Sequence, residues 1–189
     1  MRGDFLLAGA TSRTYSVRHD TPTSFPDPMP DPIIRPACAD EYDAVARVWM
    51  DSWVSTGLDQ ASESLLETLR SRVRQEIDNG WSLFVADDGG ALAAMLALHL
   101  PQRYLDMLFV APPWQGRSLG RRLLAFTREQ MPDEIWLRCV RENEKAWRWY
   151  EREGFVFEKA QLEPRMGRMM KYYRWTKDQW PGERKASAS

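Results

Sequence analysis

A short loop between a strand-like segment and a helical one constrains this chain more than any other feature. Residues 104–110 form a strand-like run, Pro112 and Pro113 end it, and a helical pattern extends from about residue 116 to residue 130. A small-residue loop that leads into a helix presents several unpaired backbone N–H groups in one place, and the helix dipole adds positive potential there. Residues 110–121 therefore predict an anion site suited to a pyrophosphate.

Two arginines, Arg117 and Arg121, add fixed positive charge to this loop. The same residues also fit a simpler structure, a short turn before an exposed basic helix. The segment lacks the Gly-Lys-Ser/Thr ending of the phosphate loops of nucleotide hydrolases, which excludes that class of site. The loop by itself leaves the anion site and the simple turn as alternatives.

A second segment, residues 143–155, follows another strand-like run and ends in Gly154 and Phe155. By their three- and four-residue spacing, three of its residues share one face of a helix: Ala146, Trp149 and Tyr150. The segment also fits an amphipathic helix that ends at a glycine and packs its tyrosine into the core. A motif of this kind needs its structural context before it indicates a site.

The other segments predict a mixed sheet with helices packed on it. The first strand begins at residue 33, Asp40 opens a helix, and the box Ser64-Leu-Leu-Glu67 caps a second helix that Asn79-Gly80 stops. Further elements are expected in this order: a hairpin of strands 81–86 and 91–100, a strand at 104–110, a helix at 116–130, a strand at 135–140, a helix at 143–153, and strands at 155–159 and 169–175.

The ends of the chain differ from the rest of it. Residues 1–32 are rich in proline and poor in apolar side chains, so we expect a tail there, with Met1 or Met29 as alternative natural starts. A single domain is expected over residues 33–176, followed by a flexible tail at 177–189. The net charge of −1, the two cysteines and the lack of a long apolar run favour a cytoplasmic protein that binds neither membranes nor nucleic acids.

Together, the two segments resemble the GNAT superfamily of acyl-CoA-dependent N-acyltransferases, over residues 33–175. Its members carry a Gln/Arg-x-x-Gly-x-Gly/Ala loop after a strand and, some two dozen residues later, an Asn-x-x-Ala-x-x-aromatic-Tyr helix that ends in Gly-Phe. The matching residues are Gln115, Gly116, Gly120, Asn143, Ala146, Trp149, Tyr150, Gly154 and Phe155. Ser118 stands where many members have glycine, so its side chain narrows the loop or its hydroxyl reaches a phosphate.

The resemblance implies a GNAT fold of the α/β (α+β) class, a mixed and mostly antiparallel sheet of six to seven strands with helices on both faces. It also implies that the loop amides cradle the pyrophosphate of CoA: Gln115, Gly116, Arg117, Ser118, Leu119 and Gly120, with Arg121 nearby. The strand edge at Leu108, Phe109 and Val110 would pair with the pantetheine arm, and an amide there would face the thioester carbonyl. Further contacts to this arm would come from Asn143, Ala146 and Trp149.

The same resemblance gives Tyr150 the role of the acid that protonates the departing thiolate. Asp106, on the strand before the loop, stands where some relatives carry a base, and alternation places it on one strand face with Tyr104, Leu108 and Val110. It also fits an ordinary strand carboxylate, with ordered water as the proton acceptor instead.

The pocket for the acceptor is expected at the first two helices. Candidate residues there are Trp49, Asp51 and Trp53, with Trp81 and Tyr104 nearby. Aromatic rings beside a carboxylate suit a cationic amine through cation–π contact, although Trp49 and Trp53 also fit ordinary core packing.

These observations predict an N-acetyltransferase that moves an acetyl group from acetyl-CoA to a primary amine, as a monomer or a homodimer. A non-catalytic acyl-CoA sensor is the alternative. No metal is expected, because His19 and His99 are isolated and Cys38 and Cys139 lack metal-ligand spacing.

Overall fold

The structure is a computed structural model that describes residues 31–164 and 166–179. The described residues belong to the unit that begins at Asp31. The predicted tail at residues 1–32 lies outside the described residues except for its last two. Of the predicted tail at residues 177–189, only residues 177–179 are described. A 3₁₀ turn, Lys177–Gln179, follows the last strand.

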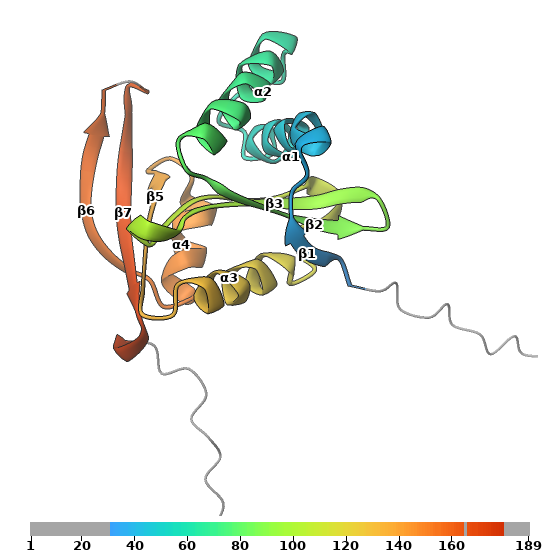
Figure 1. Cartoon of the computed structure of the whole chain (residues 1–189). Helices are drawn as coiled ribbons and strands as arrows, with labels where there is room; N and C mark the ends of the chain where they lie inside the picture. The colour runs from blue at the N-terminus through green and yellow to red at the C-terminus, as the bar shows by residue number, and fades with distance from the viewer. Residues whose placement is uncertain (1–30, 165, 180–189) are drawn as a thin grey trace, which may run out of the picture. The chain divides into compact units, whose positions relative to one another are not determined.

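The core of this unit is one mixed sheet of seven strands in the order β1-β2-β3-β4-β5-β7-β6 (Figure 1). Only β4 and β5 pair in parallel among the described strands, so the prediction of a mostly antiparallel sheet is confirmed. The strands are β1 (Ile33–Pro36), β2 (Ser82–Asp88), β3 (Ala91–His99), β4 (Tyr104–Val110), β5 (Glu134–Val140), β6 (Val156–Glu163) and β7 (Arg168–Thr176).

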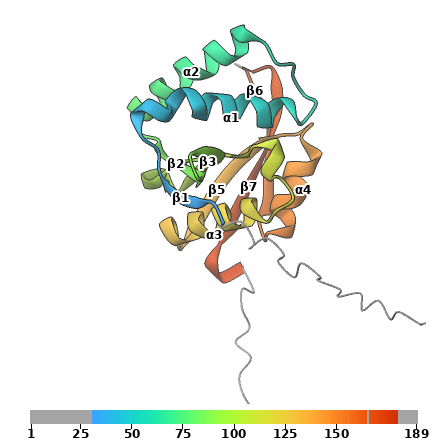
Figure 2. The same cartoon turned by 90° about the vertical axis from the view of Figure 1, so that its right-hand side faces the viewer.

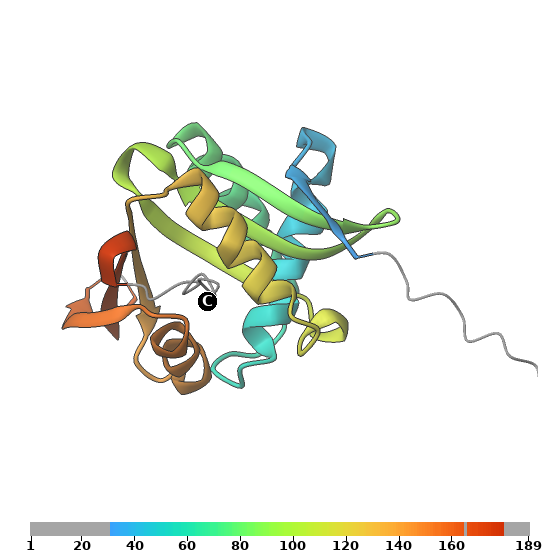
Figure 3. The same ribbon diagram turned by 90° about the horizontal axis from the view of Figure 1, so that it is seen from below.

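Helices cover both faces of the sheet, as predicted. α1 (Tyr42–Val54) and α2 (Glu63–Asp78) lie on one face, and α3 (Leu119–Gln130) and α4 (Glu144–Arg152) lie on the other (Figures 1 and 2). Seen from below, α3 runs along the central strands (Figure 3). This arrangement leaves the splayed ends of the central strands between two helical layers.

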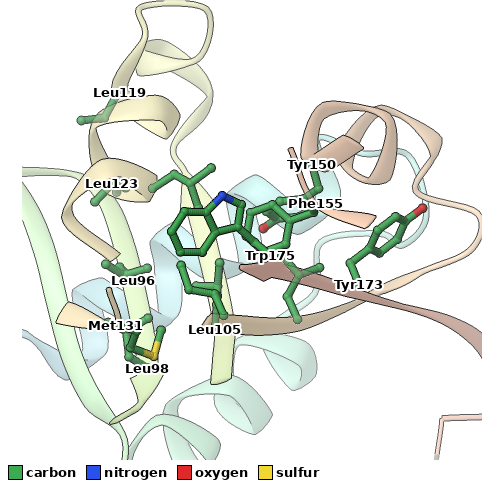
Figure 4. Close-up of a cluster of buried hydrophobic side chains, with 14 of the residues drawn as sticks. Leu96, Leu98, Leu105, Leu119, Leu123, Met131, Tyr150, Phe155, Tyr173 and Trp175 are labelled. Atoms are coloured by element: carbon green, nitrogen blue, oxygen red, sulfur yellow. The ribbon is translucent and has the colours of Figure 1, made fainter. Parts of the chain in front are cut away.

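Each helical layer buries its own apolar cluster. Under α1 and α2 the cluster includes Val45, Trp49, Leu66, Val73 and Met95. Under α3 and α4 it includes Leu96, Leu105, Leu119, Leu123, Tyr150 and Trp175, several of which Figure 4 shows in contact. A fully buried leucine side chain contributes roughly 1.5–3 kcal/mol to stability, so these clusters hold the helices on the sheet.

The start of α2 differs from the predicted one. The helix is capped by Ser62, whose hydroxyl accepts from the Leu65 amide at 3.1 Å. The predicted box at Ser64 and Glu67 is wrong, because both residues lie inside the helix. Ser62 and Ser64 are two residues apart, and both are exposed. Ser62 is the cap because its backbone is extended, with φ −153°, as an N-cap requires.

The start of α3 also lies later than predicted, at Leu119 rather than near residue 116. A 3₁₀ turn, Pro112–Trp114, follows β4, and the chain then passes through two residues with positive φ. These are Gly116, at φ 78°, and Ser118, at φ 61°. The left-handed backbone at these positions delays the helix.

The two parallel strands β4 and β5 pair over only two residues, Tyr104 with Trp136 and Leu105 with Leu137. Beyond that point the register of β4 continues with β3 alone, and β5 continues with β7. The second half of β4 therefore has an unpaired edge, which faces a gap between β4 and β5. The candidate site lies at this gap.

Candidate functional site

A groove runs along the gap between β4 and the start of α4. Its volume is about 650 Å³. The predicted acid Tyr150 lines it, and so do nearly all of the residues predicted to bind CoA: Leu108, Phe109, Val110, Gln115, Gly116, Ser118, Leu119, Gly120, Arg121, Asn143, Ala146 and Trp149. The fold thus brings both sequence motifs to one continuous surface. Arg117 is exposed and is not among the lining residues.

Side chains of the loop itself hold it in place. The indole Nε1 of Trp114 donates to Asp88 at 2.8 Å, and the amide Nε2 of Gln115 donates to the Val110 carbonyl at 2.9 Å. The same amide reaches the Ser55 hydroxyl, just beyond α1, at 3.3 Å. The Gln115 side chain therefore braces the loop between β4 and α1.

The start of α3 has main-chain donors at the groove. The Ser118 carbonyl accepts the first helical bond, from the Arg122 amide at 3.2 Å, so the amides of residues 119–121 precede the hydrogen-bonded turn. Ser118 makes no side-chain cap hydrogen bond. Amides that precede the first hydrogen-bonded turn can bind an anion, and the helix dipole adds positive potential there.

The unpaired edge of β4 also has donors. The Ala111 amide donates to the Ala93 carbonyl on β3 at 2.9 Å. Because successive amides of a strand point to opposite edges, the Leu108 and Val110 amides point away from β3 and toward the gap. This edge can accept an extended chain in the manner of an added strand.

Tyr150 lies on α4 at the inner end of the groove. Its side chain is 8% exposed and contacts the rings of Trp149 and Phe155, with centroid distances of 4.8 and 5.4 Å. Burial raises the pKa of the Tyr150 phenol well above its ordinary value, which keeps the group protonated at neutral pH. Asn143 caps α4, and its side-chain oxygen accepts from the Ala146 amide at 3.3 Å.

A second cavity, of about 460 Å³, lies between the α1–α2 layer and strands β4, β5 and β7. It includes the predicted residues Trp49, Trp53 and Asp106. The residues shared by this cavity and the groove are Leu108, Phe109, Asn143, Ala146 and Tyr150. The two spaces therefore meet beside the Tyr150 side chain.

Asp106 is the extra residue of a β-bulge. Met107 pairs with Ala97 and Leu105 pairs with Leu98, so two neighbouring positions of β3 face three residues of β4. A bulge of this kind changes the direction of side chains on the strand.

The prediction that Asp106 shares a strand face with Leu108 and Val110 is wrong, because the bulge interrupts the alternation. Leu108 and Val110 pack against the cluster under α3 and α4. The Asp106 carboxylate instead accepts from the indole Nε1 of Trp81, in the α1–α2 cluster, at 2.8 Å. His99 Nε2 lies 3.7 Å from the same oxygen, and the Asp106 side chain is 9% exposed.

Both tryptophans of the second cavity carry an arginine on their rings. The guanidinium carbon of Arg72 lies 5.0 Å from the Trp49 ring centroid, and that of Arg168 lies 5.6 Å from the Trp53 centroid. Three other candidates do not line the cavity: Asp51 is exposed on α1, Trp81 is buried behind Asp106, to which its indole donates, and the hydroxyl of Tyr104 is buried. Burial raises the pKa of the Tyr104 phenol.

Several lining residues escaped the sequence analysis. In the groove these are Ser52, Ser55, Thr56, Trp114, Glu142, Glu144, Lys145 and Arg152. In the cavity the charged ones are Asp59, Arg72, Arg138 and Arg168. Lys145 and Arg152 belong to the motif helix or its first turn and could have been found there. Trp114, Glu142 and Glu144 also lie in or directly beside the two motif segments, residues 110–121 and 143–155. The remaining residues come from elements far apart in sequence, and no local pattern marks them.

The described ranges, 31–164 and 166–179, hold no group of three or more His, Cys, Asp or Glu side chains arranged to bind a metal ion. Within those ranges, every helix is too short or too polar to cross a membrane.

Comparisons with known proteins agree with this arrangement. An acetyltransferase from Thermus thermophilus is 19% identical, with a TM-score of 0.62, and the match covers 78% of this chain and 98% of that chain. For a GCN5-related N-acetyltransferase from Rhodopseudomonas palustris the identity is 19%, the TM-score 0.61 and the coverage 78% and 97%. The PaiA N-acetyltransferase from Thermoplasma acidophilum, solved in complex with coenzyme A, is 18% identical, with a TM-score of 0.58 and coverage of 76% and 98%.

A search of curated sequences gives no match. The profile of the Acetyltransferase (GNAT) family, however, matches residues 42–155, which is more than half of the chain. Because this match contains both motifs, and the solved structures share the fold, the chain belongs to the GNAT family of acetyltransferases.

Proposed function

We propose that this protein transfers an acetyl group from acetyl-CoA to a primary amine. The observation that carries the proposal is the meeting of the groove and the second cavity at Leu108, Phe109 and Tyr150. A thioester in the groove and an amine in the cavity would come into contact there, beside a buried phenol. Tyr150 lines both spaces, so its phenol would lie beside the reacting atoms of both substrates.

The groove suits the CoA part of the donor. The free amides of residues 119–121 would bind the pyrophosphate, and Lys145 and Arg152 add positive charge along the same surface. The Leu108 and Val110 amides would pair with the pantetheine arm. One of these amides would also stabilise the negative oxygen that forms when the thioester carbonyl is attacked.

The chemistry requires proton transfers at the amine and at the leaving sulfur. A primary amine with a pKa near ~10.4 is mostly protonated at neutral pH and must lose a proton before its lone pair can attack. Asp106 would accept that proton, directly or through one water. The new C–N bond forms as the carbonyl becomes tetrahedral, and its collapse breaks the C–S bond. The Tyr150 phenol then protonates the sulfur of the leaving thiolate. The resulting phenolate would regain a proton from the nitrogen of the adduct, directly or through one water, because that nitrogen must lose its second proton to become a neutral amide.

Two measurements test this proposal. Calorimetry should show that the parent protein binds CoA, and a thiol-release assay with acetyl-CoA should show turnover with at least one member of a broad library of primary amines. A Cβ placed on Gly120 would lie 3.5 Å from Trp149, which is ordinary contact, so Gly120→Ala should still bind CoA. The longer side chain of Gly120→Leu should occupy the groove and weaken binding. A parent protein that binds no CoA at millimolar concentration would contradict the proposed function.

A further inference from the structure

The charges of the second cavity differ from those expected for a site that binds a simple cation. Three arginines line it, and two carboxylates, Asp59 and Asp106, accompany them. The Asp59 carboxylate already has hydrogen-bond partners, because it accepts from the Gln60 amide at 2.9 Å and from the Trp53 indole at 3.3 Å. Arg138 is matched by Glu163 at 2.9 Å. The remaining two arginines are Arg72 and Arg168.

Among the described residues, Arg72 has one long carboxylate contact, and Arg168 has none within ion-pair distance. The Arg72 Nε lies 3.4 Å from Glu76, a long contact across one turn of α2. Arg168 donates through Nη2 to the Leu58 carbonyl at 3.2 Å, and no described carboxylate lies within ion-pair distance of it. Both guanidinium groups therefore retain donors that a bound anion could use.

The tryptophans orient these two groups. Trp49 and Trp53 lie one turn apart on α1, so their side chains occupy the same side of the helix. A guanidinium that stacks on an aromatic ring keeps its N–H edge free for a planar, bidentate partner. The two ring contacts thus place both guanidinium groups on the wall of the cavity, each beside a tryptophan of α1.

The same stacking weakens the expectation of a cation bound on these rings. Arg72 occupies one region of the Trp49 ring, and Trp81 and Phe109 pack against the ring as well, at centroid distances of 5.8 and 6.1 Å. A substrate ammonium would have to replace a guanidinium that already makes this cation–π contact. The mostly buried Asp106 is the more suitable partner for the ammonium.

We propose that the acceptor is a small primary amine that also carries a carboxylate, and that Arg72 and Arg168 bind this carboxylate. The inference rests on the proposed acetyl transfer and specifies its substrate class. The amine would lie near Asp106 and the thioester, and the carboxylate near the two guanidinium groups. A cavity of about 460 Å³ admits a molecule of the size of an amino acid or a dipeptide.

The test compares matched pairs of amines in the thiol-release assay. Each free amino acid, ω-amino acid and dipeptide is paired with the same compound in which a primary amide replaces the carboxylate. We expect kcat/KM for the preferred acids to exceed that of their amides by about 10- to 100-fold, the range for one lost charged contact. Arg72→Gln and Arg168→Gln should each raise KM for the acid by about 10-fold and reduce this preference, with a smaller change in kcat.

Two further variants serve as controls. Arg72→Lys keeps the charge and should retain part of the preference. Arg74→Gln removes an arginine of the same helix that pairs with Asp43 at 2.7 Å outside the cavity, and it should behave as the parent protein. Calorimetry on the CoA-saturated protein gives an independent readout. N-acetylated amino acids should bind about 10-fold more tightly than their amides, and the Gln variants should lose this difference.

Acids and amides that bind or react equally well would overturn the proposed acceptor class, and so would better turnover of amines that carry a phosphate or no anion. Binding of neither member of any pair at millimolar concentration would have the same consequence. These outcomes are distinct from a failure of the proposed function, in which CoA itself does not bind and no amine releases thiol.

Discussion

Burial gives Tyr150 the property that an acid at the leaving group needs. The phenol lies at the junction of the groove and the cavity, and its pKa is raised, so it holds its proton until a strong base forms next to it. A thiolate that leaves into a poorly solvated site is such a base. The same burial would make an ionised tyrosine costly before the reaction.

Tyr150→Phe should therefore lower the rate of the chemical step by about 10- to 10³-fold while CoA affinity changes little. Single-turnover measurements isolate this step from product release. In the parent protein, the rate should not fall as the pH passes ~10, the ordinary phenol pKa, because the buried group stays protonated above it. A single-turnover rate in the variant equal to that of the parent would assign Tyr150 to packing alone.

The carboxylate of Asp106 can be tested without disturbing its hydrogen bond. Asp106→Asn keeps an oxygen that accepts from the Trp81 indole and removes only the charge. If Asp106 accepts the amine proton, kcat/KM should fall most at neutral pH, by about 10²-fold or more, and recover as rising pH deprotonates the amine in solution. If it only holds the ammonium, KM for the amine should rise with kcat nearly kept. A variant with the pH–rate profile of the parent would exclude both roles.

At the scale of elements, the loop before α3 carries backbone strain at Ser118. A residue other than glycine in the left-handed region, here at φ 61°, costs about 1 kcal/mol or more. Ser118→Gly should therefore stabilise the protein by about 0.5–1 kcal/mol, which thermal unfolding would measure, whereas Ser118→Ala keeps the strain and should not.

The same two variants separate the roles of the Ser118 side chain. If its hydroxyl contacts a phosphate, both variants should bind CoA more weakly than the parent protein does. If the side chain only narrows the loop, Ser118→Gly should bind at least as tightly as the parent. A destabilised Ser118→Gly protein would show that the loop conformation does not cost what its φ value indicates.

The first strand is fastened by one arginine. Arg35 on β1 pairs with Glu41 at 2.6 Å and with Asp87 on β2 at 2.8 Å. The Arg35 guanidinium, with help from the Cys38 amide, lowers the pKa of Glu41 to about 2. A carboxyl with a lowered pKa in the folded state adds stability above its unfolded pKa, and that stability is lost as the pH falls toward the folded value.

Glu41→Gln should accordingly cost roughly 1–2 kcal/mol at neutral pH, and the difference from the parent protein should shrink as the pH is lowered to about 3 and below. Glu67→Gln is the matched control, because Glu67 pairs with Arg70 on an exposed helix surface and should change stability little. Denaturant unfolding at several pH values measures both variants. An equal loss for Glu41→Gln at neutral and acid pH would show that the ion pair does not carry the effect.

The elements that sequence predicted well are those with strong local signals. The limits of β4 follow from the prolines after it, and the turn between β2 and β3 follows from Gly89 and Gly90. The features that the sequence did not predict depend on tertiary contacts or on ambiguous local patterns. The bulge at Asp106 breaks an alternation that a single strand gives no reason to doubt, and the stacking of Arg168 on Trp53 joins segments more than a hundred residues apart.

At the scale of the whole molecule, the groove and the cavity meet beside Leu108, Phe109 and Tyr150, which line both of them. Such an arrangement favours direct transfer, in which donor and acceptor are bound at the same time. Cys139, which lines the cavity beside this point, raises the alternative of an acetylated enzyme. Burial raises the pKa of the Cys139 thiol to about 12, so only about one molecule in 10⁵ would carry the thiolate at neutral pH.

Direct transfer predicts that initial rates measured against both substrates give intersecting double-reciprocal lines, since both must bind before either product leaves. It also predicts that protein incubated with acetyl-CoA in the absence of amine shows no acetyl group by intact mass spectrometry. Parallel lines, together with an acetyl adduct that disappears in Cys139→Ser, would establish the covalent route instead. In that case a base would have to remove the proton of the Cys139 thiol when the donor binds, although burial raises the pKa of that thiol. Asp106 would then not need to act on the amine before the C–S bond of the donor breaks.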